Sequence, residues 1–349
     1  MIAGAGTMTG EQRFLAATRR EPLDATPVWF MRQAGRCLAD YRALRQEYDI
    51  LTLAKTPDLC AQVTLMPVEA FGVDAAVMFA DIMLPLQPMG IDLEIQPDVG
   101  PIIHNPIRSR ADVDALRLFE PEEGVGFVMD AIRLVRRQLE GRTAVLGFSG
   151  APFTLACYLI EGRPSREYSL AKAFMYREPE AWHELMARLS EVIVRYLKAQ
   201  VAAGAQAVQV FDSWVGGLGP ADYVEYVQPH VRRIFAALHE VPTIHFGTHT
   251  AALLELMADA GGDVMSIDAR QSLDVAWERL GYDRGVQGNL DATRVLAGWE
   301  ATEAGARDVL ARADGRPGHI FNLGHGVLPE SDPGLLRQLV DFVHHETRR

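Results

Sequence analysis

Short apolar runs recur along the chain, and each is followed by a longer amphipathic stretch. The runs are apolar on both faces, which is typical of parallel strands that helices cover on both sides. Eight strands that alternate with helices predict an α/β fold, a (β/α)8 TIM barrel in one domain, with a doubly wound open sheet as the alternative. The strand candidates are Thr26–Phe30, Ala75–Phe79, Thr143–Phe148, Ala205–Phe211, Thr243–Phe246, Val264–Ile267, Gly285–Gln287 and His319–Phe321.

The stretches between these runs predict helices. Thr56–Ala70 opens with Thr-Pro, a favourable cap and first-turn pair. Pro179–Ala203 is long and has apolar residues at helical spacing. Further helices are expected at Pro220–Leu238, Ala251–Ala260, Leu273–Leu280, Ala292–Ala313 and Gly334–His345.

One segment, Ile91–Ile107, breaks the alternation. It holds two extended pieces, Leu93–Ile95 and Pro101–His104, around Asp98-Val99-Gly100. This pattern predicts a β-hairpin inserted after the second strand. No stretch rich in Pro, Gly or Ser marks a linker, so we expect one domain.

Composition narrows the classes of partner and compartment. The 349 residues include 46 acids and 34 bases, and a net charge of −12 argues against nucleic acid or an anionic membrane as partner. Three cysteines without a CxxC spacing argue against a disulfide framework or a Cys-rich zinc site, so a reducing cytoplasmic location is expected. No targeting segment is evident, and we expect a flexible N-terminus over residues 1–10 and the barrel domain over residues 11–349.

One uncharged run, Thr143–Ile160, is 18 residues long and raises the question of a membrane span. Gly147, Ser149, Gly150 and Pro152 interrupt it. We therefore interpret the run as a buried strand, a turn and the start of a helix.

Polar and glycine residues follow every predicted strand. In a barrel these positions meet at one end, where the active site lies. They are Arg32 to Arg36, Asp81, Gly150, Asp212 with Ser213, Gly247 with His249, Asp268 with Arg270, Asn289 with Asp291, and Asn322 to Gly326.

The segment from Arg32 to Arg45 has the strongest local charge. The segment holds four arginines and one acid, Asp40, so its net charge is +3, whereas the protein as a whole is acidic. Guanidinium groups match carboxylates and phosphates in shape, so an anionic ligand is one interpretation. The other is a solvated helix face with surface ion pairs.

Four single residues have two interpretations each. Asp81 lies among apolar neighbours and is either a helix cap or a functional carboxylate. Tyr158 is either a core tyrosine or a ligand contact, and Ser213 either caps a turn or lines the site. His325 lies between two glycines, which favours an exposed loop position near a ligand.

His245 and His249, four residues apart, raise a metal hypothesis. Gly247 between them argues against a helix, and a zinc site needs a further ligand that the sequence does not identify. We therefore predict no metal site.

Three segments resemble the signatures of the uroporphyrinogen decarboxylase family. They are Pro27 to Arg36 (PVWFMRQAGR, continuing to Tyr41-Arg42), Gly147 to Leu155 (GFSGAPFTL, followed by Tyr158), and Asn322 to Gly326 (NLGHG). Gln287 to Asp291 also fits, and the resemblance runs in order from about residue 11 to 345.

The resemblance implies a cytoplasmic enzyme of haem biosynthesis. Such an enzyme decarboxylates the four acetate side chains of uroporphyrinogen III, giving coproporphyrinogen III and four CO₂, as a homodimer without metal or organic cofactor. Related barrels are zinc-dependent corrinoid or thiol methyltransferases, which is one alternative. A non-catalytic tetrapyrrole-binding protein is another.

By motif match, the family's functional residues fall on definite positions. Asp81 and Arg32 are the implied catalytic residues. The implied substrate-binding residues are Arg32, Gln33, Ala34, Gly35, Arg36, Arg45, Asp81, Tyr158, Ser213 and His325. The chain departs from the usual pattern at Cys37, Ala39-Asp40, Ala269 and Ala292, none of which is assigned chemistry.

Overall fold

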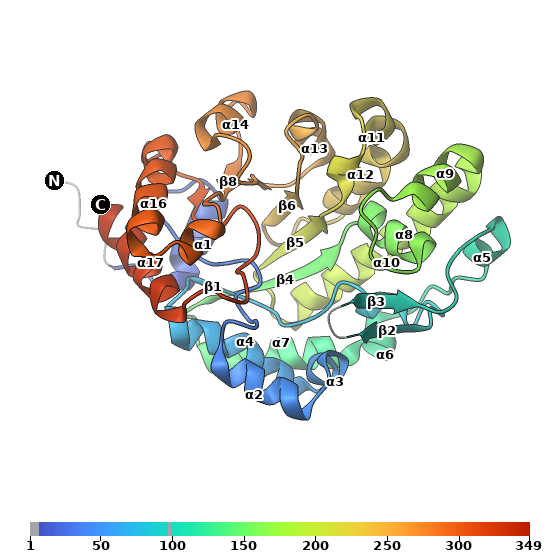
Figure 1. Cartoon of the computed structure of the whole chain (residues 1–349), viewed down its shortest axis with the longest axis horizontal. Coiled ribbons are helices and arrows are strands. Elements are labelled where there is room, and N and C mark those ends of the chain that lie inside the picture. The colour runs from blue at the N-terminus through green and yellow to red at the C-terminus, as the bar shows by residue number, and fades with distance from the viewer. Residues whose placement is uncertain (1–6, 97–98) are drawn as a thin grey trace.

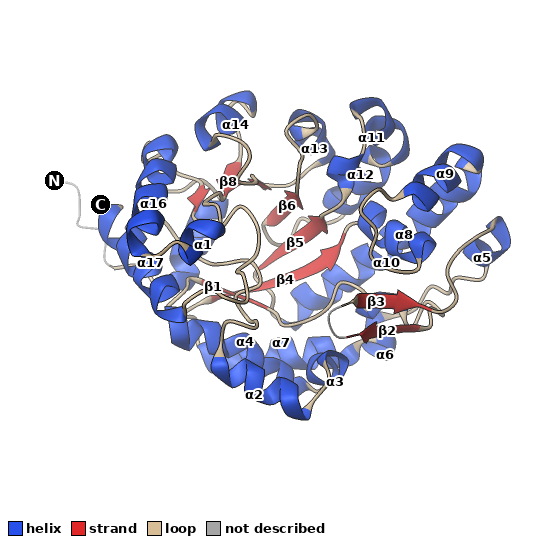
Figure 2. Ribbon diagram, viewed as in Figure 1, coloured by secondary structure: helices blue, strands red, loops and turns tan. Residues whose placement is uncertain are grey.

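The computed structural model describes residues 7–96 and 99–349. Its centre is a curled, parallel, seven-stranded sheet with helices packed around the outside (Figures 1 and 2). The order is β1 (Ala75–Val77), β4 (Ala144–Gly150), β5 (Ala207–Asp212), β6 (Thr243–Gly247), β7 (Val264–Ser266), β8 (Gly285–Gln287) and β9 (His319–Ile320). The predicted alternation of buried parallel strands and helices is therefore confirmed as a TIM-barrel-like α/β fold.

The helices surround this sheet. They are α1 (Gly10–Thr18), α2 (Ala39–Glu47), α3 (Ile50–Lys55), α4 (Pro57–Phe71), α5 (Arg110–Asp114), α6 (Pro121–Gly124), α7 (Gly126–Leu139), α8 (Pro152–Glu161), α9 (Ser169–Arg177), α10 (Pro179–Ala203), α11 (Pro220–Tyr226), α12 (Gln228–Ala236), α13 (Leu254–Ala260), α14 (Leu273–Arg279), α15 (Thr293–Leu296), α16 (Trp299–Ala313) and α17 (Pro333–Glu346), with 3₁₀ turns η1 (Leu84–Leu86) and η2 (Val215–Gly217). Within the described residues, no helix combines the length and apolar character needed to cross a bilayer.

Local sequence explains where the first long helices begin and end. In α4, Pro57 occupies the first turn, where a missing N–H costs nothing, and Gly72 ends the helix at a φ of 73°. A capping box between Thr9 and Gln12 starts α1. Of the N-terminal segment expected to be flexible, residues 1–6 lie outside the described residues, whereas the Met8 N–H donates to Asp24 at 2.9 Å.

The first predicted strand, residues 26–30, is not a regular strand, and the prediction is wrong there. Val28 and Phe321 form a single parallel bridge, with the Phe321 N–H donating to the Pro27 carbonyl at 2.9 Å. On the other side the Asp74 N–H donates to the Val28 carbonyl at 2.8 Å. Pro27 has no N–H to extend the ladder, which explains why the pairing stops at one bridge.

An antiparallel hairpin lies beside the sheet. Its strands β2 (Leu93–Gln96) and β3 (Gly100–Ile103) pair from Leu93 with Ile103 to Gln96 with Gly100. Asp98, expected in its turn, lies outside the described residues. The Ile103 N–H donates to the Gly162 carbonyl at 2.8 Å, so the hairpin is tied to the end of α8.

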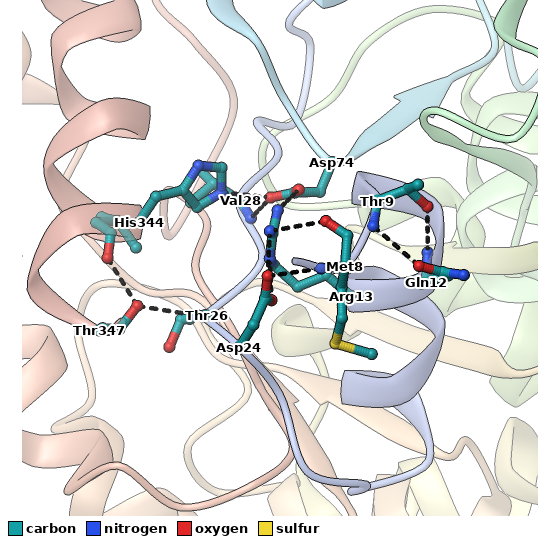
Figure 3. Close-up of polar contacts among 11 residues, drawn as sticks. Met8, Thr9, Gln12, Arg13, Asp24, Thr26, Val28, Asp74, His344 and Thr347 are labelled. Atoms are coloured by element: carbon teal, nitrogen blue, oxygen red, sulfur yellow. Dashed lines mark hydrogen bonds and ion pairs between the residues drawn. The ribbon is translucent and has the colours of Figure 1, made fainter. Parts of the chain in front are cut away.

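A buried carboxylate joins the two ends of the sheet. Asp74, just before β1, is 2% exposed and accepts from Arg13 Nη1 at 2.6 Å and from the Val28 N–H at 2.7 Å (Figure 3). His344 Nε2 of α17 lies 2.7 Å from the same carboxylate. Arg13 also binds Asp24, and despite the opposing effect of burial these two acids raise the pKa of Arg13 above its usual value.

A second polar chain crosses the interior of the sheet. Trp29 Nε1 donates to Gln287 Oε1 at 2.8 Å, and Gln287 Nε2 donates to Gln209 Oε1 at 3.0 Å and to Ser266 Oγ at 3.2 Å. These bonds link residues 26–30 to β8, β5 and β7. Because buried polar groups are costly without partners, the chain fixes one arrangement of these strands.

We predict that Asp74→Ala lowers the free energy of unfolding by about 3–5 kcal/mol, because it leaves part of the Arg13 guanidinium and the Val28 N–H buried without an acceptor. Chemical denaturation measures this change. Asp341→Ala is the matched control, since its carboxylate is 68% exposed and 3.8 Å from Arg337. The control should change stability by about 0.5 kcal/mol or less. Equal effects of the two substitutions would show that Asp74 does not hold the sheet ends together.

Candidate active site

A cavity of about 900 Å³ opens at the C-terminal ends of the strands. This is the end of a barrel-like sheet where strand-to-helix loops build active sites. Eight of the residues expected at the site line it: Arg32, Ala34, Gly35, Arg36, Asp81, Tyr158, Ser213 and His325. Residues from four separate loops and from α8 are thus brought together.

Two expected residues, Gln33 and Arg45, do not line this cavity. The Gln33 side chain is fully buried, accepts from the Phe30 N–H at 3.0 Å and donates to the Ala75 carbonyl at 2.9 Å. It therefore joins the loop to β1. Arg45 lies in an adjoining cavity of about 520 Å³, and its guanidinium donates to the Tyr48 carbonyl.

Arg32 has a left-handed backbone, with a φ of 59°. Strained backbone of this kind persists only where the surroundings enforce it, and it gathers at functional sites. A Cβ at Gly326 would lie 2.6 Å from Arg32 Cδ, and one at Gly35 would lie 2.9 Å from the Arg32 carbonyl oxygen. Gly326 therefore leaves room for the Arg32 side chain, and Gly35 leaves room for the Arg32 backbone.

Asp81 caps a turn rather than a helix, since no side chain caps η1. One carboxylate oxygen, Oδ1, accepts from the Met83 N–H at 2.8 Å, which starts the turn before η1. The side chain also lines the cavity. Burial raises the pKa of Asp81, against the Met83 N–H and the positive charge of Arg32, which both favour the charged form.

Aromatic rings form one wall of the cavity, and of these only Tyr158 was predicted there. The Trp214 ring lies 4.0 Å from that of Tyr158 and 4.8 Å from that of Tyr168, centroid to centroid, and all three line the cavity. Burial, and then the charge of Asp81, raise the pKa of Tyr158. Burial also raises the pKa of Tyr168 to about 12, so both rings stay neutral at physiological pH. The only sequence signal for Trp214 was its place directly after Ser213.

Three phenylalanines make an apolar floor. The Phe211 ring lies edge-on to Phe148 at 5.3 Å and to Phe246 at 5.2 Å, and all three line the cavity. They lie in the C-terminal parts of β4, β5 and β6. A flat apolar ligand would contact this floor, while its charged groups reach the polar loops above.

A buried acid supports the aromatic wall from behind. Asp212, fully buried at the end of β5, accepts from Thr154 Oγ1 at 3.2 Å, and the same hydroxyl accepts from the Trp214 N–H at 3.3 Å. Burial raises the pKa of Asp212 to about 7, against the Thr154 hydrogen bond.

His325 is exposed at the mouth of the cavity, as its neighbouring glycines predicted. Partial loss of solvation, and then the positive charges of Arg32 and Arg270, lower the pKa of His325, against the charge of Asp268. The ring is therefore neutral at pH 7 and can donate or accept a hydrogen bond.

His245 and His249 do not form a metal site together. His245 is fully buried in β6, with Nδ1 at 3.1 Å from the Gly261 carbonyl, and burial lowers its pKa to about 4. His249 instead lies on the cavity. Across residues 7–96 and 99–349, no group of three or more His, Cys, Asp or Glu residues is arranged to hold a metal ion.

Comparison with solved structures gives the fold. A methyltransferase from Methanosarcina mazei superposes with a TM-score of 0.82 over 97% of this chain and 99% of its own, at 17% sequence identity. At that identity the likeness concerns the fold alone.

Comparison with known sequences gives the family. The sequence model described as uroporphyrinogen decarboxylase (URO-D) matches residues 9–346. A protein of Sorangium cellulosum named uroporphyrinogen decarboxylase is 57% identical over 95% of each chain, and one of Streptomyces coelicolor is 51% identical over 98% of this chain and 97% of its own. One of Carboxydothermus hydrogenoformans is 53% identical over 95% of each chain. The chain therefore belongs to the uroporphyrinogen decarboxylase family, whose members are carboxy-lyases.

Proposed function

We propose that the chain decarboxylates uroporphyrinogen III to coproporphyrinogen III in the cavity described above. The observation that carries this proposal is the carboxylate of Asp81, the one acid among the described residues that line a cavity with an apolar floor and arginines at its rim. The substrate is a tetrapyrrole macrocycle with eight peripheral carboxylates. Its apolar centre suits the phenylalanine floor, and its periphery suits guanidinium groups.

The substrate supplies its own electron sink. Protonation of a pyrrole ring carbon next to the acetate side chain gives an iminium-like cation. The bond between the acetate methylene and its carboxylate then breaks, CO₂ leaves, and the electron pair neutralises the ring. A proton adds to the methylene carbon to give a methyl group, and the ring carbon loses its proton. Each round therefore consumes one proton and releases one CO₂, and it needs no cofactor.

Asp81 and Arg32 have distinct roles in this reaction. The Asp81 carboxylate faces the pyrrole N–H groups, and its charge opposes a cation that exists only after ring protonation. It therefore stabilises the transition state more than the bound substrate. Arg32, whose side chain lies in the space left by Gly326, binds a substrate carboxylate through its guanidinium fork. Arg36, Ala34, Gly35, Tyr158, Ser213 and His325 line the substrate, and Gln33 and Arg45 act from behind the loop.

We also propose a complete (β/α)8 barrel in one domain over residues 11–349. Residues 26–30 are hydrogen-bonded to both Phe321 and Asp74, which supports their position as the eighth strand, between β9 and β1. The β2–β3 hairpin is then an insertion after β1. A cytoplasmic homodimer is proposed from the family resemblance, and three buried free thiols agree with a reducing compartment.

Replacing Gly326 by alanine should displace Arg32 and lower turnover. The new Cβ would lie 2.6 Å from Arg32 Cδ, and a misplacement of about 1 Å can cost on the order of 10²-fold in rate. Gly126→Ala is the control, because a Cβ there meets nothing within 4 Å. Steady-state kcat should fall only in the first variant. Full activity of Gly326→Ala would mean that the placement of Arg32 does not matter.

The function itself is tested by anaerobic incubation with uroporphyrinogen III, with the oxidised products separated by carboxylate number. Wild type should yield the four-carboxylate product, and Asp81→Asn should lose on the order of 10³ in kcat. Unit charges ~4 Å apart attract by about 4 kcal/mol at an effective dielectric near 20, and each 1.36 kcal/mol is about tenfold in rate.

Asp81→Glu keeps the charge and should retain more activity than Asp81→Asn. Thermal denaturation should show that both variants are folded. Were Asp81 only a cap, asparagine would serve nearly as well and kcat would hold. Absence of any seven- to four-carboxylate product from intact wild type would overturn the assignment.

A further inference from the structure

The arginines assigned so far lie on one side of the cavity. Arg32 and Arg36 follow residues 26–30, which lie between β9 and β1. Along the sheet, β6 is the fourth element from that segment in either direction, so its loop lies across the cavity from them. A macrocycle with carboxylates around its whole periphery also presents them to this far side.

His249, two residues after β6, occupies that side. Its exposed side chain lines the cavity, and its backbone is left-handed, with a φ of 60°. Nothing in the resemblance or the mechanism above assigns His249 a role.

A buried carboxylate holds this unusual backbone. Asp268, 1% exposed, accepts from the His249 N–H at 2.5 Å through Oδ2 and from the Arg270 N–H at 2.8 Å through Oδ1. One acid therefore holds the backbone at two positions, on the adjacent loops after β6 and β7. Such hydrogen bonds to an ionised acceptor are short and about twice as strong as neutral ones.

Packing holds the same loop from its other side. The Thr248 hydroxyl donates to the Ser213 carbonyl at 2.6 Å. A Cβ at Gly216 would lie 2.2 Å from the Thr248 carbonyl oxygen and 2.8 Å from His249 Cβ. The His249 loop is thus seated against the Ser213 loop and has one position, as a preorganised binding residue requires.

We propose that His249 binds a peripheral carboxylate of the substrate across the cavity from Arg36, and that Asp268 is its positioning residue. This inference rests on the proposed function and adds a specificity-determining contact to it. Imidazole N–H groups donate hydrogen bonds to carboxylates. The bound group is an acetate or a propionate of the substrate, which share this chemistry.

His249→Asn is the direct test, because asparagine tolerates left-handed backbone and keeps the N–H that Asp268 accepts. We expect KM for uroporphyrinogen III to rise about five- to tenfold, with kcat within about twofold of wild type. A matching rise in the inhibition constant of coproporphyrinogen III identifies a propionate, because the product keeps only those side chains. A rise confined to the substrate identifies an acetate. An unchanged KM overturns the proposal.

Asp268→Asn separates positioning from general stability. It should raise KM by a similar factor in the wild-type background and add little in the His249→Asn background. A lower melting temperature with unchanged KM would overturn the positioning role. His345→Asn, at a side chain 83% exposed, is the control and should leave KM unchanged. Turnover by wild type in the same assay shows that a negative result concerns His249 and not the proposed function.

Discussion

The carboxylate of Asp74 is the interaction on which the rest of the fold depends. It binds Arg13 of α1, the backbone of Val28 and His344 of α17 (Figure 3). Both ends of the chain therefore meet where residues 26–30 lie beside the start of β1. The loops that carry Arg32 and His325 begin close to this junction. The Met31 N–H donates to Asn322 Oδ1 at 3.1 Å, and the Val327 N–H donates to the Met31 carbonyl at 2.8 Å. These hydrogen bonds therefore set the relative positions of the Arg32 and His325 loops.

Strands and loops contribute different parts of the cavity. Regular strands supply the phenylalanine floor, whose positions follow from the register of β4, β5 and β6. Loops supply the charged groups, and several adopt backbone that only their surroundings stabilise, as at Arg32 and His249. Buried acids behind the loops, such as Asp268, accept hydrogen bonds from the loop backbone and so hold the site residues in place.

Sequence patterns predicted the buried strands well because burial on both faces leaves continuous apolar runs, as in the fully buried β4. They failed at residues 26–30, where an apolar run is interrupted by Pro27 and a side chain replaces ladder hydrogen bonds. Motifs predicted Arg32, Asp81 and His325 on the cavity, and the structure places them there. His249 was predicted at this end of the barrel but not as a ligand contact, and Trp214 was not predicted, because only the fold shows which side chains after the strands line the cavity.

A crystal structure with coproporphyrinogen III bound under anaerobic conditions tests the central claim most directly. The account predicts the macrocycle on the phenylalanine floor, with its pyrrole nitrogens about 3 Å from the Asp81 carboxylate. Its propionates should contact the arginines after residues 26–30. A macrocycle bound elsewhere, or one that turns its carboxylate edge toward Asp81, would contradict both the site and the role of that carboxylate.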